Sequence, residues 1–352
     1  MTDTTEAVRD GRPRDAIELV LLHIWRDHLR NPALGVDDDY FTQGGTSLQA
    51  VRTLSEIRRR TGVSLPLPAM ARAGSVTAMA RLLRDGYADT PTPLVPIRPG
   101  KPGGPVVACV HPLGGSVLWY RHLADALPRG HTCVGLQARA LDPRLSPDHT
   151  IGEMAAAYRA ELARAYRPEQ LVLVGYSFGG LVAYEMASRM AADGERPAAV
   201  VLLDTAVTRR EQPPASRARL LWSLVNHNFG LDLSADDLAT LSPDAMCARI
   251  LDEAVARGVL PPGFGPDRLR RLVEIYPINA EAERVYRLPT YPWPLDLVRP
   301  REPRVDAESL EIWSEHCPAG VRVHRVPGSH LDLLAPSHAP AVAEVIAGLP
   351  SA

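Results

Sequence analysis

The sequence lacks the features that mark several classes of protein. Its four cysteines, Cys109, Cys133, Cys247 and Cys317, lie far apart and form no C-x-x-C pair, so the sequence indicates neither a disulfide framework nor a zinc site. A formal net charge of -2 argues against a protein that binds nucleic acid or a membrane surface. No apolar run approaches the length of a membrane span, and the polar N-terminus does not read as a signal peptide. We therefore expect a soluble, cytoplasmic protein.

The length and composition are those of a globular protein with more than one part. The chain has 352 residues, of which 45% are hydrophobic and 23% charged. Residues 87–104 are too rich in proline and glycine for a helix or a central strand, so they predict a linker. The linker would separate a small domain at residues 14–86 from a larger one at residues 105–349.

The smaller part shows the spacing of short amphipathic helices. Apolar residues recur at intervals of three and four from Asp15 to Leu29, again after Ser47, and again from Ser75 to Arg84. These segments predict a small all-α bundle. Ser47 follows two glycines at the start of the second helix, where a serine can serve as the N-cap. That explanation leaves the acidic and aromatic run before it unaccounted for.

Residues 38–48, D-D-Y-F-T-Q-G-G-T-S-L, resemble a known motif. Peptidyl carrier domains of nonribosomal peptide synthetases commonly have D-x-F-F-x-x-G-G-x-S-L at their phosphopantetheine attachment site, and the resemblance covers residues 14–86. It implies that Ser47 carries 4'-phosphopantetheine as a phosphodiester. It also implies two kinds of partner, a phosphopantetheinyl transferase and the upstream condensation and adenylation domains of an assembly line. A helix N-terminus favours the phosphate that Ser47 would carry.

A nucleophile elbow is predicted in the larger part. Leu171 to Val174 form a short apolar run typical of a strand buried on both faces, and a helix of small residues follows from Leu181. Between them, G-Y-S-F-G fits the G-x-S-x-G pattern, in which glycines permit a tight, strained turn that exposes the serine oxygen. The pattern alone is weak in a chain with 26 glycines. The strand before it and the helix after it make Ser177 a candidate nucleophile.

The surrounding pattern alternates strands and helices and predicts an α/β-hydrolase domain with a mostly parallel sheet. Ligands of such sheets bind beyond the carboxyl ends of the strands, where His111 to Gly115, Ser177 and Asp204 all fall. From about residue 208 to 290 the pattern changes to charged amphipathic helices separated by proline and glycine. We expect this insertion to be a helical lid, although a plain helical subdomain would have the same pattern.

A serine nucleophile needs a base and an orienting carboxylate, which follow it in this fold in the order acid, then histidine. Ser177, Asp204 and His330 satisfy that order. His330 follows a late predicted strand, where the base belongs, whereas His111 precedes the nucleophile and is expected to be a structural or pocket residue. The weaker candidates for the acid lie in the predicted lid: Asp232, Asp236 and Asp237.

An oxyanion hole requires two amides beside the nucleophile. We expect one to be the backbone N–H of Phe178, the residue after the nucleophile. The other should come from the loop after the first predicted strand of this domain, where Leu113 precedes two glycines that permit a close backbone approach.

Four segments of residues 105–349 are similar to the thioesterase domains that terminate nonribosomal peptide and polyketide assembly lines, pathways of secondary metabolism that include antibiotic biosynthesis. They are V-H-P-L-G-G, G-Y-S-F-G-G, L-L-D-T and P-G-S-H-L-D-L-L. The resemblance implies that an acyl or peptidyl group moves from the thioester arm on Ser47 to Ser177, and is then released by hydrolysis or macrocyclisation.

Two other functions are compatible with these motifs. The chain could be a free-standing editing thioesterase or an acyl or aminoacyl shuttle of an assembly line, which keeps the same chemistry. It could also be a non-catalytic carrier and docking module with a degenerate hydrolase fold, but the intact set of Ser177, Asp204 and His330 argues against this.

Overall fold

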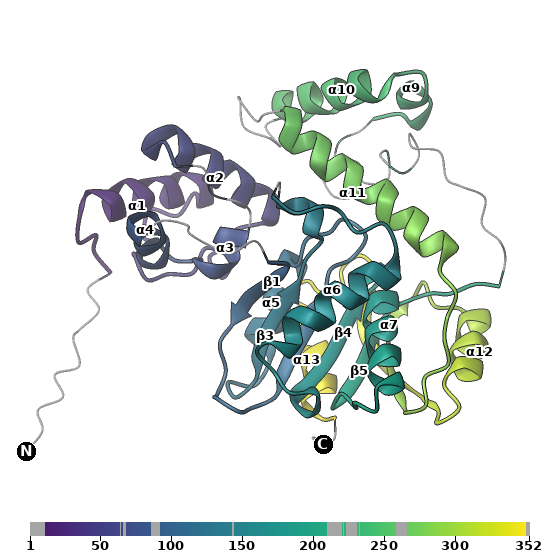
Figure 1. Ribbon diagram of the computed structural model, residues 1–352. Coiled ribbons are helices and arrows are strands. Elements are labelled where there is room, and N and C mark those ends of the chain that lie inside the picture. Colours follow the sequence, from purple (N-terminus) through teal and green to yellow (C-terminus); the bar gives the residue numbers. More distant parts are fainter. Residues whose placement is uncertain are drawn as a thin grey trace, which may run out of the picture. The chain divides into compact units, whose positions relative to one another are not determined.

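A computed structural model describes residues 11–63, 65, 68–85, 92–142, 144–209, 220, 222, 231, 233–257 and 266–349. The chain divides into two compact units, of which the first holds helices α1 to α4 and the second holds the sheet and the other helices (Figure 1). The division falls inside the predicted linker, of which residues 87–91 lie outside the described residues. None of the described helices is long and apolar enough to span a membrane.

The first unit is the predicted all-α bundle. Its helices are α1 (Ala16–Leu29), α2 (Ser47–Thr61), α3 (Pro68–Arg72) and α4 (Val76–Asp85). Asp15 caps α1 by accepting from Glu18 N–H, and both α2 and α4 pack on α1. The buried rings of Trp25 and Tyr40 meet edge to face at 5.4 Å, and Tyr40 bonds Thr53 Oγ1 through its hydroxyl at 2.8 Å. An aromatic core therefore holds the loop before α2 against the helices.

The second unit is built on a seven-stranded sheet, ordered β1-β3-β2-β4-β5-β6-β7, in which only β1 is antiparallel to its neighbour. All residues of β2, β4 and β5 are buried, as their continuous apolar runs predict. The strands are β1 (Leu94–Arg98), β2 (Val106–Val110), β3 (Thr132–Leu136), β4 (Leu171–Tyr176), β5 (Ala199–Leu203), β6 (Leu295–Glu302) and β7 (Val321–Ser329).

Strand β1 corrects the linker prediction, because residues 94–98 of that segment belong to the sheet. The strand pairs with β3 along the edge of the sheet. Val95 and Ile97 are buried while Pro96 between them is exposed. An edge strand tolerates proline because one of its sides needs no ladder hydrogen bonds. The proline content of the segment concealed this alternation.

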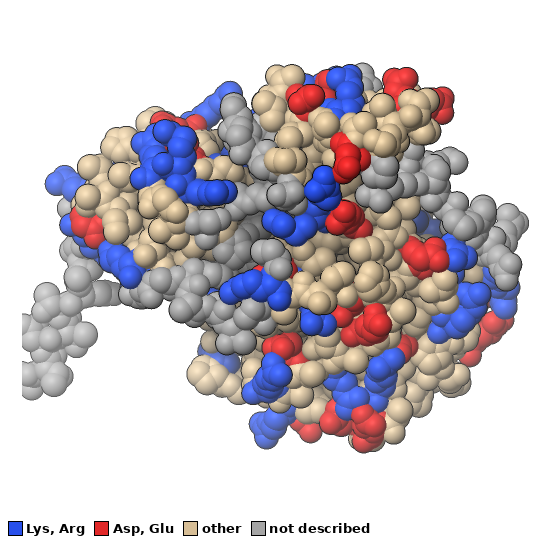
Figure 2. All heavy atoms as spheres, turned by 45° about the horizontal axis from the view of Figure 1, so that its top comes forward, with Lys and Arg blue, Asp and Glu red and all other residues tan. Residues whose placement is uncertain are grey.

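Helices cover both faces of the sheet (Figure 1). On one face α6 packs against α7, and α5 packs against α13 on the other. The segments are η1 (Leu118–Tyr120), α5 (Arg121–Ala126), η2 (Arg139–Leu141), α6 (Ile151–Ala163), η3 (Pro168–Gln170), α7 (Phe178–Ala192), α12 (Ala307–His316) and α13 (Ala339–Ala347). Figure 2 shows basic and acidic side chains interspersed over the second unit, in keeping with the small net charge.

An insertion between β5 and β6 occupies the place of the predicted lid. Its helices are α9 (Ala235–Ala239), α10 (Pro243–Ala256) and α11 (Pro266–Val285). Helices α10 and α11 pack together, and α11 also contacts η2, α6 and α7 of the core. Residues 210–219, 221, 223–230 and 258–265 of the predicted lid lie outside the described residues, as does Asp232. The described part of the insertion contains the predicted helices, and its role as a lid stays a prediction.

Candidate active site

Three strand ends carry the residues predicted to form a catalytic triad. Ser177 follows β4, Asp204 follows β5 and His330 follows β7, all at the carboxyl edge of the sheet. Ser177 has φ 55° and Asp204 has φ 45°, the left-handed region that costs energy for residues other than glycine. A Cβ atom on Gly175 would lie 2.2 Å from Gly179 O, so only glycine fits before the elbow. The predicted strained turn is therefore present.

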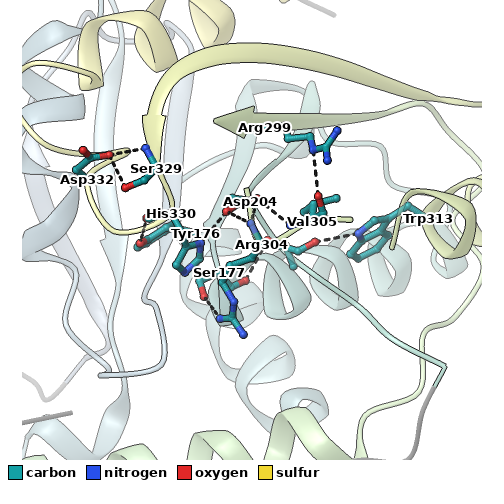
Figure 3. Close-up of polar contacts among 11 residues, drawn as sticks. Tyr176, Ser177, Asp204, Arg299, Arg304, Val305, Trp313, Ser329, His330 and Asp332 are labelled. Atoms are coloured by element: carbon teal, nitrogen blue, oxygen red, sulfur yellow. Dashed lines mark hydrogen bonds and ion pairs between the residues drawn. The ribbon is translucent and has the colours of Figure 1, made fainter. Parts of the chain in front are cut away.

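Asp204 holds His330 in one orientation (Figure 3). The fully buried carboxylate of Asp204 lies 2.8 Å from His330 Nδ1. It also accepts from the backbone N–H groups of Arg304 at 2.8 and 3.1 Å and of Val305 at 3.2 Å. Because a carboxylate only accepts hydrogen bonds, Nδ1 is the donor and Nε2 is left to act as a base.

Tyr176 supports the histidine from the elbow itself. Its hydroxyl donates to the carbonyl oxygen of His330, and the two rings lie 5.1 Å apart. Tyr120 in turn accepts from Tyr176 N–H at 2.8 Å and donates to Val110 O at 2.6 Å. These tyrosines connect the elbow to β2 and to the loop after β7. The sequence analysis did not identify them: Tyr176 occupies a variable position of G-x-S-x-G, and Tyr120 belongs to no motif.

The nucleophile has a neighbour that the sequence reasoning missed. Arg304 Nη1 donates to Ser177 Oγ over 3.4 Å (Figure 3). Within the described part of the chain, the hydroxyl of Ser177 makes this bond and makes none to the His330 ring. Arg304 follows β6 in a run of charged and proline residues without periodicity, so nothing in the sequence distinguished it.

His111 is a structural residue, as expected. It is fully buried, with Nδ1 2.8 Å from Pro112 O and Nε2 2.8 Å from Tyr158 Oη. Since the carbonyl only accepts, Nδ1 donates to it and Tyr158 donates to Nε2. Burial lowers the pKa of His111 to about 4, so the ring is neutral near pH 7. Both nitrogens are thus engaged in holding the loop after β2.

That loop also contacts the insertion. Asn279 of α11 donates to Leu113 O at 2.8 Å, and a Cβ atom on Gly115 would lie 2.9 Å from Ile275 Cγ2 of the same helix. Phe178, the first residue of α7, stacks on the His111 ring at 5.9 Å. The two predicted oxyanion donors, Leu113 and Phe178, therefore lie on backbone that buried contacts fix from both sides.

The start of α2 revises the reading of Ser47 as an N-cap. Thr46 is the cap: Gln49 N–H donates to its Oγ1 at 3.2 Å, and its own N–H donates to Gln49 Oε1 at 2.9 Å. Ser47 is the first helical residue, so a capping role does not explain why a serine stands at this position. A Cβ atom on Gly45 would lie 2.3 Å from the Tyr40 ring, which accounts for a glycine of the motif.

The acidic and aromatic run before Ser47 has structural roles. Asp37 accepts from Thr77 Oγ1 at 2.8 Å, Asp38 from Gly35 N–H at 2.7 Å, and Asp39 from Phe41 N–H at 3.0 Å. These bonds set the course of the loop, and the buried aromatic rings anchor it. The loop therefore presents the first turn of α2 in a fixed place within its unit.

Two family models match separate parts of this chain. Residues 105–349 match the family described as "Thioesterase domain" and residues 20–83 the one described as "Phosphopantetheine attachment site". The chain is 30% identical to pyochelin synthetase PchF of Pseudomonas aeruginosa over 391 residues, covering 92% of this chain and 21% of the synthetase. It is 32% identical to a dimodular nonribosomal peptide synthase of Bacillus subtilis over 203 residues, covering 57% of this chain and 8% of the synthase.

Solved structures are similar over either the whole chain or its larger part. Holo-AB3403, a four-domain nonribosomal peptide synthetase bound to AMP and glycine, matches 95% of this chain and 26% of its own with a TM-score of 0.68 and 28% identity. The Vlm2 thioesterase domain shares the fold over 74% of this chain and 100% of its own, with a TM-score of 0.54 and 23% identity. The chain thus spans about a quarter or less of these multidomain relatives and the full length of an isolated thioesterase domain.

Proposed function

Because this chain belongs to the thioesterase domain family over residues 105–349 and carries a phosphopantetheine attachment domain over residues 20–83, we propose that it releases a carrier-bound acyl or peptidyl chain. The acyl or peptidyl group is held as a thioester on the phosphopantetheine arm of Ser47, moves to Ser177, and leaves by hydrolysis or macrocyclisation. The observation that carries the proposal is the 2.8 Å bond between Asp204 and His330 beside a strained serine elbow.

In the first half of the reaction His330 Nε2 takes the proton of Ser177 as Oγ attacks the thioester carbonyl. The bond to the carrier sulfur breaks, and His330 returns the proton to the departing thiol. In the second half His330 activates water or a nucleophile of the acyl chain, which attacks the ester and restores Ser177. The buried carboxylate of Asp204 stabilises the imidazolium that forms in both halves.

The charge on the reacting carbonyl oxygen also needs stabilisation. In this proposal the backbone N–H groups of Leu113 and Phe178 donate to that oxygen in each tetrahedral intermediate. The hydrogen bond from Asn279 to Leu113 O and the buried bonds of His111 support the role, because rigid donors need no reorganisation as charge develops.

Ser47 is proposed to hold 4'-phosphopantetheine, whose thiol supplies the thioester bond. Its position fits that group, since it begins a helix of 15 residues whose cap is provided by Thr46. A phosphopantetheinyl transferase would be required to modify it, and condensation and adenylation domains upstream would supply the acyl or peptidyl chain. The match of residues 20–83 to the phosphopantetheine attachment family, and the similarity of 92% of this chain to pyochelin synthetase PchF, support this assignment.

Intact-protein mass spectrometry tests both assignments together. The full chain is incubated with a phosphopantetheinyl transferase and an acyl-coenzyme A, and wild type is compared with Ser47→Ala and Ser177→Ala. We expect no added mass on Ser47→Ala, a persistent acyl mass on Ser177→Ala, and transient acyl mass with free product on wild type. Ser314→Ala, an exposed serine of α12, serves as the matched control.

The same experiment separates the proposal from its competitors. Continued product formation by Ser177→Ala would contradict the assignment of Ser177 as the nucleophile. Modification of Ser47→Ala by the transferase would contradict the assignment of Ser47 as the attachment site. Transfer of the acyl group to an added second carrier, without free acid or cyclic product, would identify a shuttle instead.

A further inference from the structure

Arg304 brings a positive charge to the nucleophile. Its guanidinium donates to Ser177 Oγ at 3.4 Å, while its own backbone N–H is bound by the Asp204 carboxylate (Figure 3). The hydrogen bonds from the Arg304 backbone N–H to Asp204 therefore fix the backbone from which this side chain extends. The residue is exposed, so the guanidinium is open to solvent and to a ligand.

Among the described residues, no carboxylate lies within ion-pair distance of the Arg304 guanidinium. The Asp204 carboxylate already accepts from His330 and from two backbone amides. Glu283 of α11 interacts electrostatically with Arg304: burial raises the pKa of Glu283, and the guanidinium lowers it.

The position of the Arg304 guanidinium relative to the reacting atoms decides which part of the substrate it can bind. Ser177 Oγ becomes the ester oxygen of the acyl-enzyme, and the acyl α-carbon is two covalent bonds from that atom. A substituent near the α-carbon therefore lies within reach of the guanidinium. Five N–H donors in a planar fork match a carboxylate better than any other common group of an acyl chain.

We propose that Arg304 forms a subsite for an anionic group on the acyl chain, close to the thioester carbonyl. The inference rests on the proposed function of Ser177. Acyl or aminoacyl groups with a carboxylate near the thioester are then the preferred substrates of this thioesterase, and Arg304 is a specificity-determining residue.

Matched thioesters provide the test. Aspartyl and asparaginyl thioesters of N-acetylcysteamine, and the glutamyl and glutaminyl pair, differ in charge at nearly constant shape. For the wild-type full chain we expect kcat/KM to favour the carboxylate of each pair by roughly tenfold, the low end for a hydrogen bond to a charged group because the site is open to water. Arg304→Gln should remove the preference mainly through KM, and Arg304→Lys should keep part of it. Arg301→Gln, at a neighbouring exposed arginine, should behave as wild type.

Labelling of Ser177 by a small neutral fluorophosphonate reports on the nucleophile apart from acyl recognition. We expect wild type and Arg304→Gln to be labelled at similar rates. Equal losses on both members of a pair together with slow labelling would show that Arg304 acts on Ser177 itself and would overturn the subsite. Turnover by wild type without preference would overturn the subsite alone. Failure of wild type to hydrolyse any of the thioesters would count against the subsite and the proposed function together.

Discussion

Asp204 and His330 are 126 residues apart in the sequence and are joined by a 2.8 Å hydrogen bond at the carboxyl edge of the sheet. Strands β5, β6 and β7 are parallel neighbours, so the loops after β5 and β7 lie at the same edge of the sheet. The Asp204 carboxylate is fully buried, whereas the His330 side chain keeps 15% of its surface exposed. This pair determines the tautomer on which the proposed chemistry depends.

Asp204→Asn should lower kcat for thioester hydrolysis by roughly 10⁴-fold, because an amide no longer enforces a proton on Nδ1 of His330. Steady-state kinetics on a soluble thioester would measure the loss. Asp296 offers a matched control, since it is a fully buried aspartate that bonds His324 at 2.7 Å near the start of β6. Asp296→Asn should affect stability and leave kcat within a few-fold. Comparable losses of kcat in both variants would contradict a specific role for Asp204.

Stability should fall on acidification because of His111. Its pKa is about 4 in the folded protein, below its ordinary value of 6.5, so the unfolded chain binds more protons between these values. The free energy of unfolding should therefore decrease from pH 6.5 to pH 4, by roughly 3 kcal/mol from this group alone. Urea unfolding at several pH values checks this. His111→Gln should flatten the dependence, and His149→Gln, at an exposed position, should leave it unchanged.

Thr46 and Ser47 should separate structural from chemical effects at adjacent positions. Thr46→Ala removes the cap of α2 and should destabilise that helix by about 1 kcal/mol, whereas Thr46→Ser keeps it. Hydrogen exchange of the α2 amides, followed by mass spectrometry, measures this local effect. Ser47→Ala should leave the exchange nearly unchanged and abolish modification by the transferase. Faster exchange in Ser47→Ala than in Thr46→Ala would contradict the assignment of the cap.

Asn279 should influence the chemistry through the loop after β2. Asn279→Asp keeps the size of the side chain but loses the N–H group that binds Leu113 O, and it sets two acceptors against each other. We expect kcat to fall about tenfold or more, the order of a weakened oxyanion donor, with a smaller change in KM. The value of kcat and the rate of fluorophosphonate labelling of Ser177 should fall together. An unchanged kcat would show that the loop keeps its position without this bond.

The sequence predicted the parts of the fold and site that depend on local chemistry. The elbow around Ser177 and the order of Asp204 and His330 could be found because glycines, buried strands and triad order leave a signal in the chain. Strand β1 was missed because Pro96 on its exposed side resembles a linker residue. Ser47 was considered as an N-cap because the true cap, Thr46, is its neighbour. Arg304 and Asn279 were missed because only tertiary packing brings them to Ser177 and Leu113.

The edge strand β1 has a practical consequence for anyone who shortens this protein. A fragment beginning at residue 105, where the match to the thioesterase family starts, would retain the pairing of β3 with β2 but lose β1, which covers the outer edge of β3. The outer edge of the buried, apolar β3 would then present unpaired backbone groups, which is the condition that favours aggregation between chains. A fragment that begins before Leu94 keeps that edge covered and should remain monodisperse where the shorter one precipitates.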